Sequence, residues 1–166
     1  MTLPRSLLAA VIAGAFLAIA ATTALVLTGW SVWAGVASSL ATVLLVGSVW
    51  AAGGRRVAGF LSAVADRAYD AAVLSSLAWV LRDAVPQASL AALLTLAGGF
   101  LGAYVVSRGR ALGFAAPTVP WERGLRCALV SVALLTGSML PLWAAAAFAL
   151  AIALSRAFIV PRGAAA

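Results

Sequence analysis

Long apolar runs follow one another along almost the whole chain, separated by short polar breaks. A run of about 20 apolar residues can cross the hydrocarbon core of a bilayer as a helix. The runs cover residues 7–28, 32–52, 57–81, 90–106 and 127–160. The last run is too long for one crossing at about 1.5 Å per residue, but Gly137, Ser138 and Pro141 offer a turn that divides it. The sequence therefore predicts six membrane-spanning helices.

Composition supports a membrane location. Of the 166 residues, 65% are apolar and only 9% are charged, whereas soluble domains carry about 25% charged residues. Lipid solvates outward-facing Leu, Ala and Val, which water does not. We expect an all-α, polytopic membrane protein that forms one domain over residues 1–166 as a six-helix bundle.

The basic residues are distributed unevenly. All 11 cations are arginines, and the net charge is +7. With six spans, only Arg82 falls on one side of the membrane, and the other arginines fall on or toward the opposite side: Arg5, Arg55, Arg56, Arg67, Arg108, Arg110, Arg123, Arg126, Arg156 and Arg162. Cytoplasmic loops collect positive charge, so we expect both chain ends in the cytoplasm and a multi-pass protein of the cell membrane. Trp30, Trp33, Trp79 and Trp143 fall near the opposite ends of the spans, as interfacial aromatics do.

The charge also bears on partners. A nucleic-acid-binding protein needs a soluble basic face with aromatic side chains, and none is evident here, so we expect no nucleic acid. Membrane lipid headgroups or a nucleotide diphosphate fit the arginines better. The chain has no histidine and a single cysteine, Cys127. An internal disulfide and a Ser-His-Asp arrangement are therefore excluded.

The third run, residues 57–81, is unusual because it carries Asp66, Arg67 and Asp70. Asp66 and Asp70 are four residues apart and share a helix face, with Ser62 one turn earlier. Ionisable groups inside a membrane helix are costly and face a cavity, a partner or an ion. Two interpretations stay open: a functional site, or simple neutralisation of the carboxylates by Arg67 and the arginines just before this run.

Three short strings between residues 59 and 129 match one known family in order and spacing. They are Phe60-Leu-Ser-Ala-Val-Ala-Asp-Arg-Ala-Tyr-Asp-Ala-Ala-Val-Leu, Ala103-Tyr-Val-Val-Ser-Arg-Gly-Arg-Ala-Leu-Gly and Glu122-Arg-Gly-Leu-Arg. Together they resemble the CDP-alcohol phosphatidyltransferase family, especially its actinobacterial members. The six predicted spans also fit the six-helix layout of that family.

The resemblance implies a role in phospholipid biosynthesis. The family transfers a phosphate-linked group from a CDP-activated donor, such as a CDP-linked lipid, to an alcohol and releases CMP. Four hallmark Asp hold divalent metal, Mg²⁺ or Mn²⁺, against the donor diphosphate, and the third is also thought to activate the acceptor hydroxyl. Asp66 matches the last hallmark Asp, and Asp70 matches an additional Asp of the actinobacterial members; both are the expected metal ligands.

The chain departs from the family at the other hallmark positions. Ser62 stands where the family has its base Asp, and a hydroxyl is not basic enough to replace that carboxylate. Ala41 and Leu44 stand at the first two Asp positions, and no acidic residue precedes Asp66. We therefore expect impaired or lost catalysis in this chain alone.

The arginines follow the family more closely. Arg108, Arg123 and Arg126 match family positions near the pocket that receives phosphate-bearing groups, and a guanidinium binds such oxygens as a planar fork. The positive-inside distribution explains the same residues. We expect a polar, cytoplasm-facing cavity lined by the third span and by the arginine-bearing connection over residues 107–126.

Two alternatives accompany a transferase-like protein with impaired catalysis. One is a pseudoenzyme that serves as a structural or regulatory partner of an active homologue in a homo- or hetero-dimer. The other is a small ion-coupled carrier in which Asp66 and Asp70 form the coupling pair. Gly98 and Gly102 have GxxxG spacing, which indicates either a helix-dimer face or close packing inside the bundle.

Overall fold

The computed structural model describes residues 4–52, 55–114 and 120–160, which fold into helices and contain no strand. The helices are α1 (Arg5–Leu27), α2 (Ser31–Ala52), α3 (Arg56–Tyr69), η1 (Asp70–Leu74), α4 (Ser75–Leu81), α5 (Pro86–Ala111), α6 (Pro120–Thr136) and α7 (Leu140–Ile159). The predicted all-α class is confirmed. The segment η1 is a single π-helical stretch, so α3, η1 and α4 follow one another without a break.

Four of the described helices, α1, α2, α5 and α7, are long and apolar enough to cross a membrane. A helix satisfies its own backbone hydrogen bonds, which the bilayer interior requires. These apolar helices indicate a membrane protein. The helix α6 has 17 residues and begins with charged side chains, and α3 has 14 residues before η1 begins.

Two of the predicted breaks coincide with glycines in the left-handed region. Gly29 has a φ of 79°, and the Trp30 N–H donates to the Leu25 carbonyl at 2.9 Å, which closes the C-terminus of α1 as glycine C-caps do. Gly137, with a φ of 65°, separates α6 from α7. The predicted division of the run over residues 127–160 is therefore confirmed.

The predicted connection over residues 107–126 is shorter than expected, because both flanking helices extend into it. α5 continues to Ala111, and α6 begins at Pro120. The arginines of this segment that are helical are Arg108, Arg110, Arg123 and Arg126. Arginine favours helices, cations stabilise a helix C-terminus, and proline suits the first helical position. Polarity alone thus wrongly predicted a loop here.

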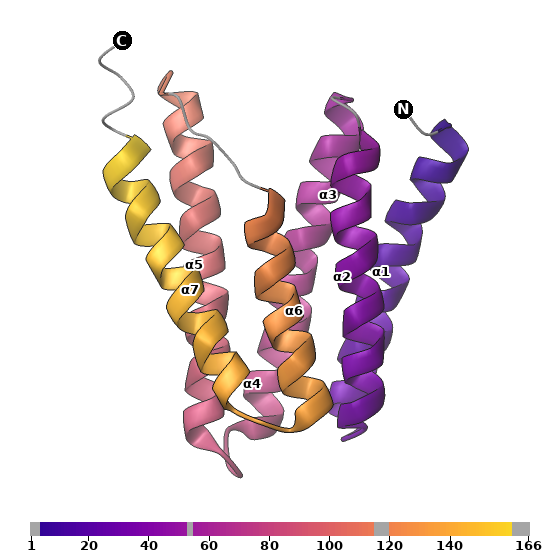
Figure 1. The fold of residues 1–166 in the computed structure, drawn as a ribbon, viewed down its shortest axis with the longest axis vertical. Coiled ribbons are helices and arrows are strands. Elements are labelled where there is room, and N and C mark those ends of the chain that lie inside the picture. Colours follow the sequence, from indigo (N-terminus) through magenta and orange to yellow (C-terminus); the bar gives the residue numbers. More distant parts are fainter. Residues whose placement is uncertain (1–3, 53–54, 115–119, 161–166) are drawn as a thin grey trace.

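The helices form two groups that meet at one end. α5 packs along α7, α1 packs along α2, and α2 packs along α6. In Figure 1, α1, α2 and α3 stand on one side, α5 and α7 stand on the other, and α6 lies between them. The two groups approach each other at the lower end of the view, near α4, and diverge toward the upper end, where α1 begins and α7 ends. Most arginines belong to helix segments at the upper end; Arg162 lies outside the described residues.

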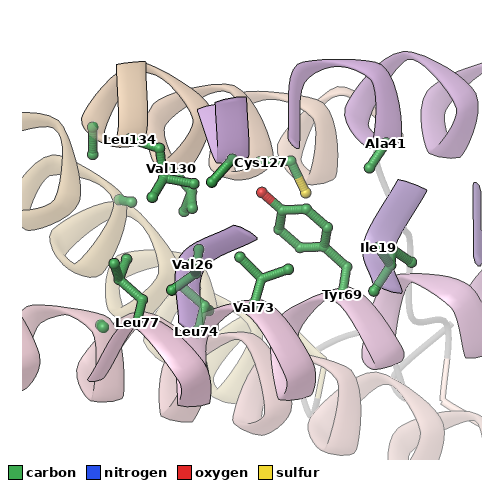
Figure 2. Packing of buried hydrophobic residues seen from close by; sticks show 14 of the residues in the cluster. Ile19, Val26, Ala41, Tyr69, Val73, Leu74, Leu77, Cys127, Val130 and Leu134 are labelled. Atoms are coloured by element: carbon green, nitrogen blue, oxygen red, sulfur yellow. The ribbon is translucent and has the colours of Figure 1, made fainter. Parts of the chain in front are cut away.

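The main core lies where α3, η1 and α4 face α6. Figure 2 shows Tyr69, Val73, Leu74 and Leu77 opposite side chains of α6 that include Val130, with side chains of α1 and α2 completing the cluster. Three buried hydroxyls form a hydroxyl cluster within this core: Ser38 Oγ lies 2.6 Å from Tyr69 Oη and 2.8 Å from Ser131 Oγ. Helix α2 packs along both α3 and α6, and in this arrangement the charged turn of α3 faces the first turns of α6.

Candidate functional site

The two acidic residues of α3 and η1 point into the bundle. Asp66 lies in the last turn of α3, and Asp70 is the first residue of η1. Their exposed fractions are 1% and 0%. Both contact one guanidinium, since Arg126 Nη2 lies 2.9 Å from Asp70 Oδ2 and 3.5 Å from Asp66 Oδ1. The predicted shared face is therefore confirmed.

Helix α6 supplies two of the arginines that neutralise these carboxylates. Besides the contacts of Arg126, Arg123 Nε lies 2.9 Å from Asp66 Oδ1. The residues are spaced three apart on α6, so both side chains reach the same face. The family resemblance implies phosphate binding for both arginines. Their pairing with the aspartates depends on which helices are neighbours, which the sequence does not show.

Arg67 completes the set from the same helix as Asp66. Its guanidinium pairs with Asp66 Oδ2, and its Nη1 lies 3.1 Å from Asp70 Oδ2. The same Nη1 donates to the Gly99 carbonyl of α5 at 2.7 Å, and the Arg67 guanidinium lies over the Phe100 ring. Asp66, Asp70, Arg67, Arg123 and Arg126 together form what we call the ion cluster. Burial of two carboxylates is costly, and these charge-assisted hydrogen bonds offset that cost.

A glycine of α5 makes room for the ion cluster. A Cβ added at Gly99 would lie 2.8 Å from Asp70 Oδ2 and 3.5 Å from Arg126 Cζ. On the next face of α5, a Cβ at Gly98 would lie 2.8 Å from the backbone of Ala149 in α7. For Gly98, and for Gly102 near Arg156, the structure thus supports close packing inside the bundle, one of the two interpretations of the GxxxG spacing.

Ser62, at the family position of the base Asp, lies one turn before Asp66 and is buried. Its Oγ is 2.8 Å from Ser48 Oγ of α2, and Arg123 Nη1 approaches it at 3.3 Å. A guanidinium beside a hydroxyl donates to it and does not remove its proton. The Ser62 hydroxyl therefore forms hydrogen bonds within the protein, and neither of these two neighbours is a base that could remove its proton.

A cavity of about 350 Å³ lies beside the ion cluster, between α3, α5, α6 and α7. Among the described residues that line it, five are arginines and two are acidic. These charged residues are Asp66, Arg67, Arg110, Glu122, Arg123, Arg126 and Arg156. Arg156 of α7 forms an ion pair with Glu122 of α6. The surplus of arginines makes the cavity electropositive and suits it to an anion.

The cavity differs in its lining from the sequence-based expectation. Arg123 and Arg126 line it as predicted, whereas Arg108 is exposed and is not among its lining residues. Arg110 and Arg156 line it instead. Arg110 is two residues beyond Arg108 on α5, which turns it to a different face of the helix. If the helix had been expected to continue to Ala111, this spacing would have placed the two arginines on different faces.

The acidic residues do not fit a divalent metal. Hard cations such as Mg²⁺ and Mn²⁺ need several oxygen ligands, with carboxylates supplying most of the charge. Both oxygens of Asp66 and one oxygen of Asp70 already face guanidinium groups, which leaves Asp70 Oδ1 as a buried oxygen without a hydrogen-bond partner. Among residues 4–52, 55–114 and 120–160, no group of three or more His, Cys, Asp or Glu is arranged to hold a metal.

The upstream positions add no ligands. Ala41 is fully buried in the apolar core, and Leu44 packs against the same core. Neither side chain has an oxygen atom that could bind a metal. At these two positions, where the resemblance implies carboxylates, α2 therefore has apolar side chains that pack in the core. We conclude that the residues present are suited to a charge-neutralised cluster beside an anion-attracting cavity.

Comparison of the sequence with protein-family models and with curated proteins finds no match. The resemblance to CDP-alcohol phosphatidyltransferases therefore rests on the three strings between residues 59 and 129 alone.

Proposed function

We propose that this chain is a membrane protein resembling the CDP-alcohol phosphatidyltransferases that binds a phosphate-bearing lipid or nucleotide and does not by itself transfer it. One observation carries the proposal. The two carboxylates that the resemblance implies as metal ligands form ion pairs with arginines, and they lie beside a cavity lined by more arginines than acidic residues. Because the carboxylates are paired with arginines, they are not available to bind the metal that transfer requires. The arginines of the cavity can still bind phosphate oxygens.

The proposed topology has six spans with both ends in the cytoplasm. The continuous helical stretch from α3 through α4 and the shorter α6 would be the third and fifth spans. An even number of crossings is supported by the position of the start of α1 and the end of α7 at the same end of the bundle (Figure 1). The arginine-rich end would face the cytoplasm of the cell membrane.

Loss of transfer follows from charge and basicity. In the family's reaction a metal neutralises the donor diphosphate while a carboxylate activates the acceptor hydroxyl. Here Ser62 occupies the position of that carboxylate, and its hydroxyl cannot act as a base at neutral pH. Guanidinium groups can neutralise phosphate charge, but none of them removes a proton from an alcohol.

The test is a CMP-release assay on the purified chain with CDP-diacylglycerol, a panel of alcohols and Mg²⁺ or Mn²⁺. A homologue with all hallmark Asp provides the positive control. We expect release at the rate of the protein-free blank. Release that depends on this chain and disappears in Asp66→Asn would contradict the proposal.

A partner role extends the proposal. A chain that binds the ligand without transferring it has a use as a structural or regulatory subunit of an active homologue, in a hetero-dimer or a homo-dimer. Co-expression with a tagged, full-motif homologue tests this role, and we expect the two chains to co-purify. Recovery of this chain only as a monomer would contradict it.

The ion-coupled carrier is supported less well. A coupling carboxylate must exchange its proton or ion during transport. Both oxygens of Asp66 face guanidinium groups, and Asp70 shares two of these. Proton uptake would have to break those pairs in each cycle.

A further inference from the structure

We infer that the cavity holds its phosphate-bearing ligand directly through guanidinium groups, with no divalent cation between protein and phosphate. The inference uses the same cavity as the proposed function, and so rests on it, but it makes a separate claim about metal. It also departs from what the family resemblance implies, because there the metal mediates binding of the diphosphate.

The first step is that the acidic groups are already neutralised. Three guanidiniums approach Asp66 and Asp70 at 2.9–3.5 Å, apart from the closer Arg67–Asp66 pair. The cluster of two carboxylates and three arginines has a net positive charge. A divalent cation entering it would meet repulsion from the arginines and would have to displace their hydrogen bonds.

The second step concerns the remaining wall. Arg110 of α5 and Arg156 of α7 also line the cavity, and Arg156 forms an ion pair with Glu122. Arginines of α3, α5, α6 and α7 therefore line the cavity. This arrangement places donors around a phosphate group from several directions, as binding of an oxyanion without metal requires.

The third step is an unused donor. Arg126 is only 9% exposed, and its Nε is a buried nitrogen without a hydrogen-bond partner. Buried polar groups are nearly always paired. Arg126 lines the cavity, so its guanidinium has donor capacity that the protein does not use, next to the space that a ligand would occupy.

The cavity also indicates what accompanies the phosphate. Its wall includes apolar side chains, among them Val106, Phe148 and Ile152. An inorganic ion alone would leave this surface without contacts. The ligand class that matches both parts is a phosphate or diphosphate ester with an apolar or ring-bearing organic group, which a phospholipid headgroup region or a nucleotide both provide.

The experiment is a calorimetric titration of the full chain in detergent micelles, with inorganic pyrophosphate and with dioctanoyl phosphatidate as separate probes. Each titration is run in EDTA and in excess Mg²⁺. We expect binding of at least one probe in EDTA, and we expect Mg²⁺ not to tighten its Kd by more than about twofold, because Mg²⁺ competes with the guanidinium groups for the phosphate oxygens. Tighter binding of phosphatidate assigns the lipid source, and tighter binding of pyrophosphate assigns the diphosphate source.

Two variants with the same change of charge give the matched comparison. Arg123→Gln removes a guanidinium from the cavity wall, and Arg108→Gln removes an exposed one outside it. We expect Arg123→Gln to weaken binding by about tenfold or more, and Arg108→Gln to weaken it by less than about twofold. Circular dichroism and gel filtration establish that both variants are folded. Arg123 is preferred to Arg126 here because it is the less buried of the two.

The outcomes separate the two claims. Binding that appears only with Mg²⁺ overturns the metal-free inference and leaves ligand binding by the cavity intact. Equal losses in both variants overturn the assignment to the cavity. Failure of the folded chain to bind either probe in either condition overturns the inference, whereas CMP release in the assay above overturns the loss of transfer and does not affect metal-free binding.

Discussion

Two buried polar clusters lie on the same pair of helices and differ in almost every respect. The hydroxyl cluster joins Ser38, Tyr69 and Ser131 between α2, α3 and α6 through neutral hydrogen bonds of 2.6 and 2.8 Å. Figure 2 shows Tyr69, one member of this cluster, among buried apolar side chains. The ion cluster begins one turn earlier on α3, contains five charged side chains, and lies beside a cavity.

The difference separates packing from binding. Each hydroxyl of the hydroxyl cluster is paired with another protein atom, so the cluster can specify how the helices fit together without any ligand. The ion cluster has a net positive charge and an unpartnered donor at Arg126 Nε. A cluster that served packing alone would be expected to balance its charges and satisfy its donors. The ion cluster is therefore the region to which we assign function.

The largest expected effect comes from removing the most buried arginine of the ion cluster. Arg126→Met takes one of two guanidinium partners from buried Asp70 and one of three from Asp66, and we expect the free energy of unfolding to fall by up to about 3–5 kcal/mol. Equilibrium unfolding in mixed micelles measures the change. The double variant Arg126→Met/Asp70→Asn also removes the buried charge that has lost one of its two partners and should recover part of the loss, as a double-mutant cycle would show. A loss of under about 1 kcal/mol in the single variant would show that the ion cluster does not hold α3 to α6.

A smaller effect should follow from filling the space beside Asp70. Gly99→Ala places a Cβ 2.8 Å from Asp70 Oδ2, and this oxygen can move only by loosening its pairs with Arg67 and Arg126. We expect a cost of about 1–3 kcal/mol. Gly47→Ala on α2 is the matched control because no atom lies within 4 Å of its added Cβ. The control should be neutral or stabilise by up to about 1 kcal/mol. Equal stability of the two variants would contradict the close approach of α5 to the ion cluster.

The hydroxyl cluster should respond modestly, and without any effect on ligand. Tyr69→Phe removes one hydrogen bond while Ser38 and Ser131 keep theirs to each other. We expect a loss of about 0.5–1.5 kcal/mol in stability. The Kd for pyrophosphate or phosphatidate should stay unchanged. A weakened Kd in a folded Tyr69→Phe protein would mean that the two clusters are not separate in function.

The smallest effect is expected for an ion pair outside both clusters. Arg82 lies 3.0 Å from Asp83 and over the Trp79 ring, and all three side chains are exposed. Exposed pairs contribute about 0–1 kcal/mol, so Arg82→Ala should change the unfolding free energy by no more than about 1 kcal/mol. A loss as large as that of Arg126→Met would refute burial as the reason for the strength of the ion cluster.

Local pattern explains most of what could be predicted about the fold. The apolar runs, the glycines at positions 29 and 137, and the turn between Arg82 and Pro86 predicted the order of helices, because each depends on residues close in sequence. The boundaries near residues 107–126 were wrong because polar residues at the end of a membrane helix look like a loop in composition. The π-helical segment from Asp70 to Leu74 has no signal in the sequence that we can identify.

The chain by itself determined that two carboxylates share one face of an otherwise apolar helix, since a spacing of four residues is a property of the helix alone. It also determined that the chain has too few acidic residues for the metal site of the CDP-alcohol phosphatidyltransferases, the family that it resembles. Only the tertiary structure decided which arginines meet those carboxylates, that Arg110 and Arg156 line the cavity where Arg108 does not, and that a side chain at Gly99 would displace the Asp70 carboxylate. Those outcomes depend on contacts between α3, α5, α6 and α7, and such contacts are set by the packing of whole helices and not by the spacing of residues within one of them.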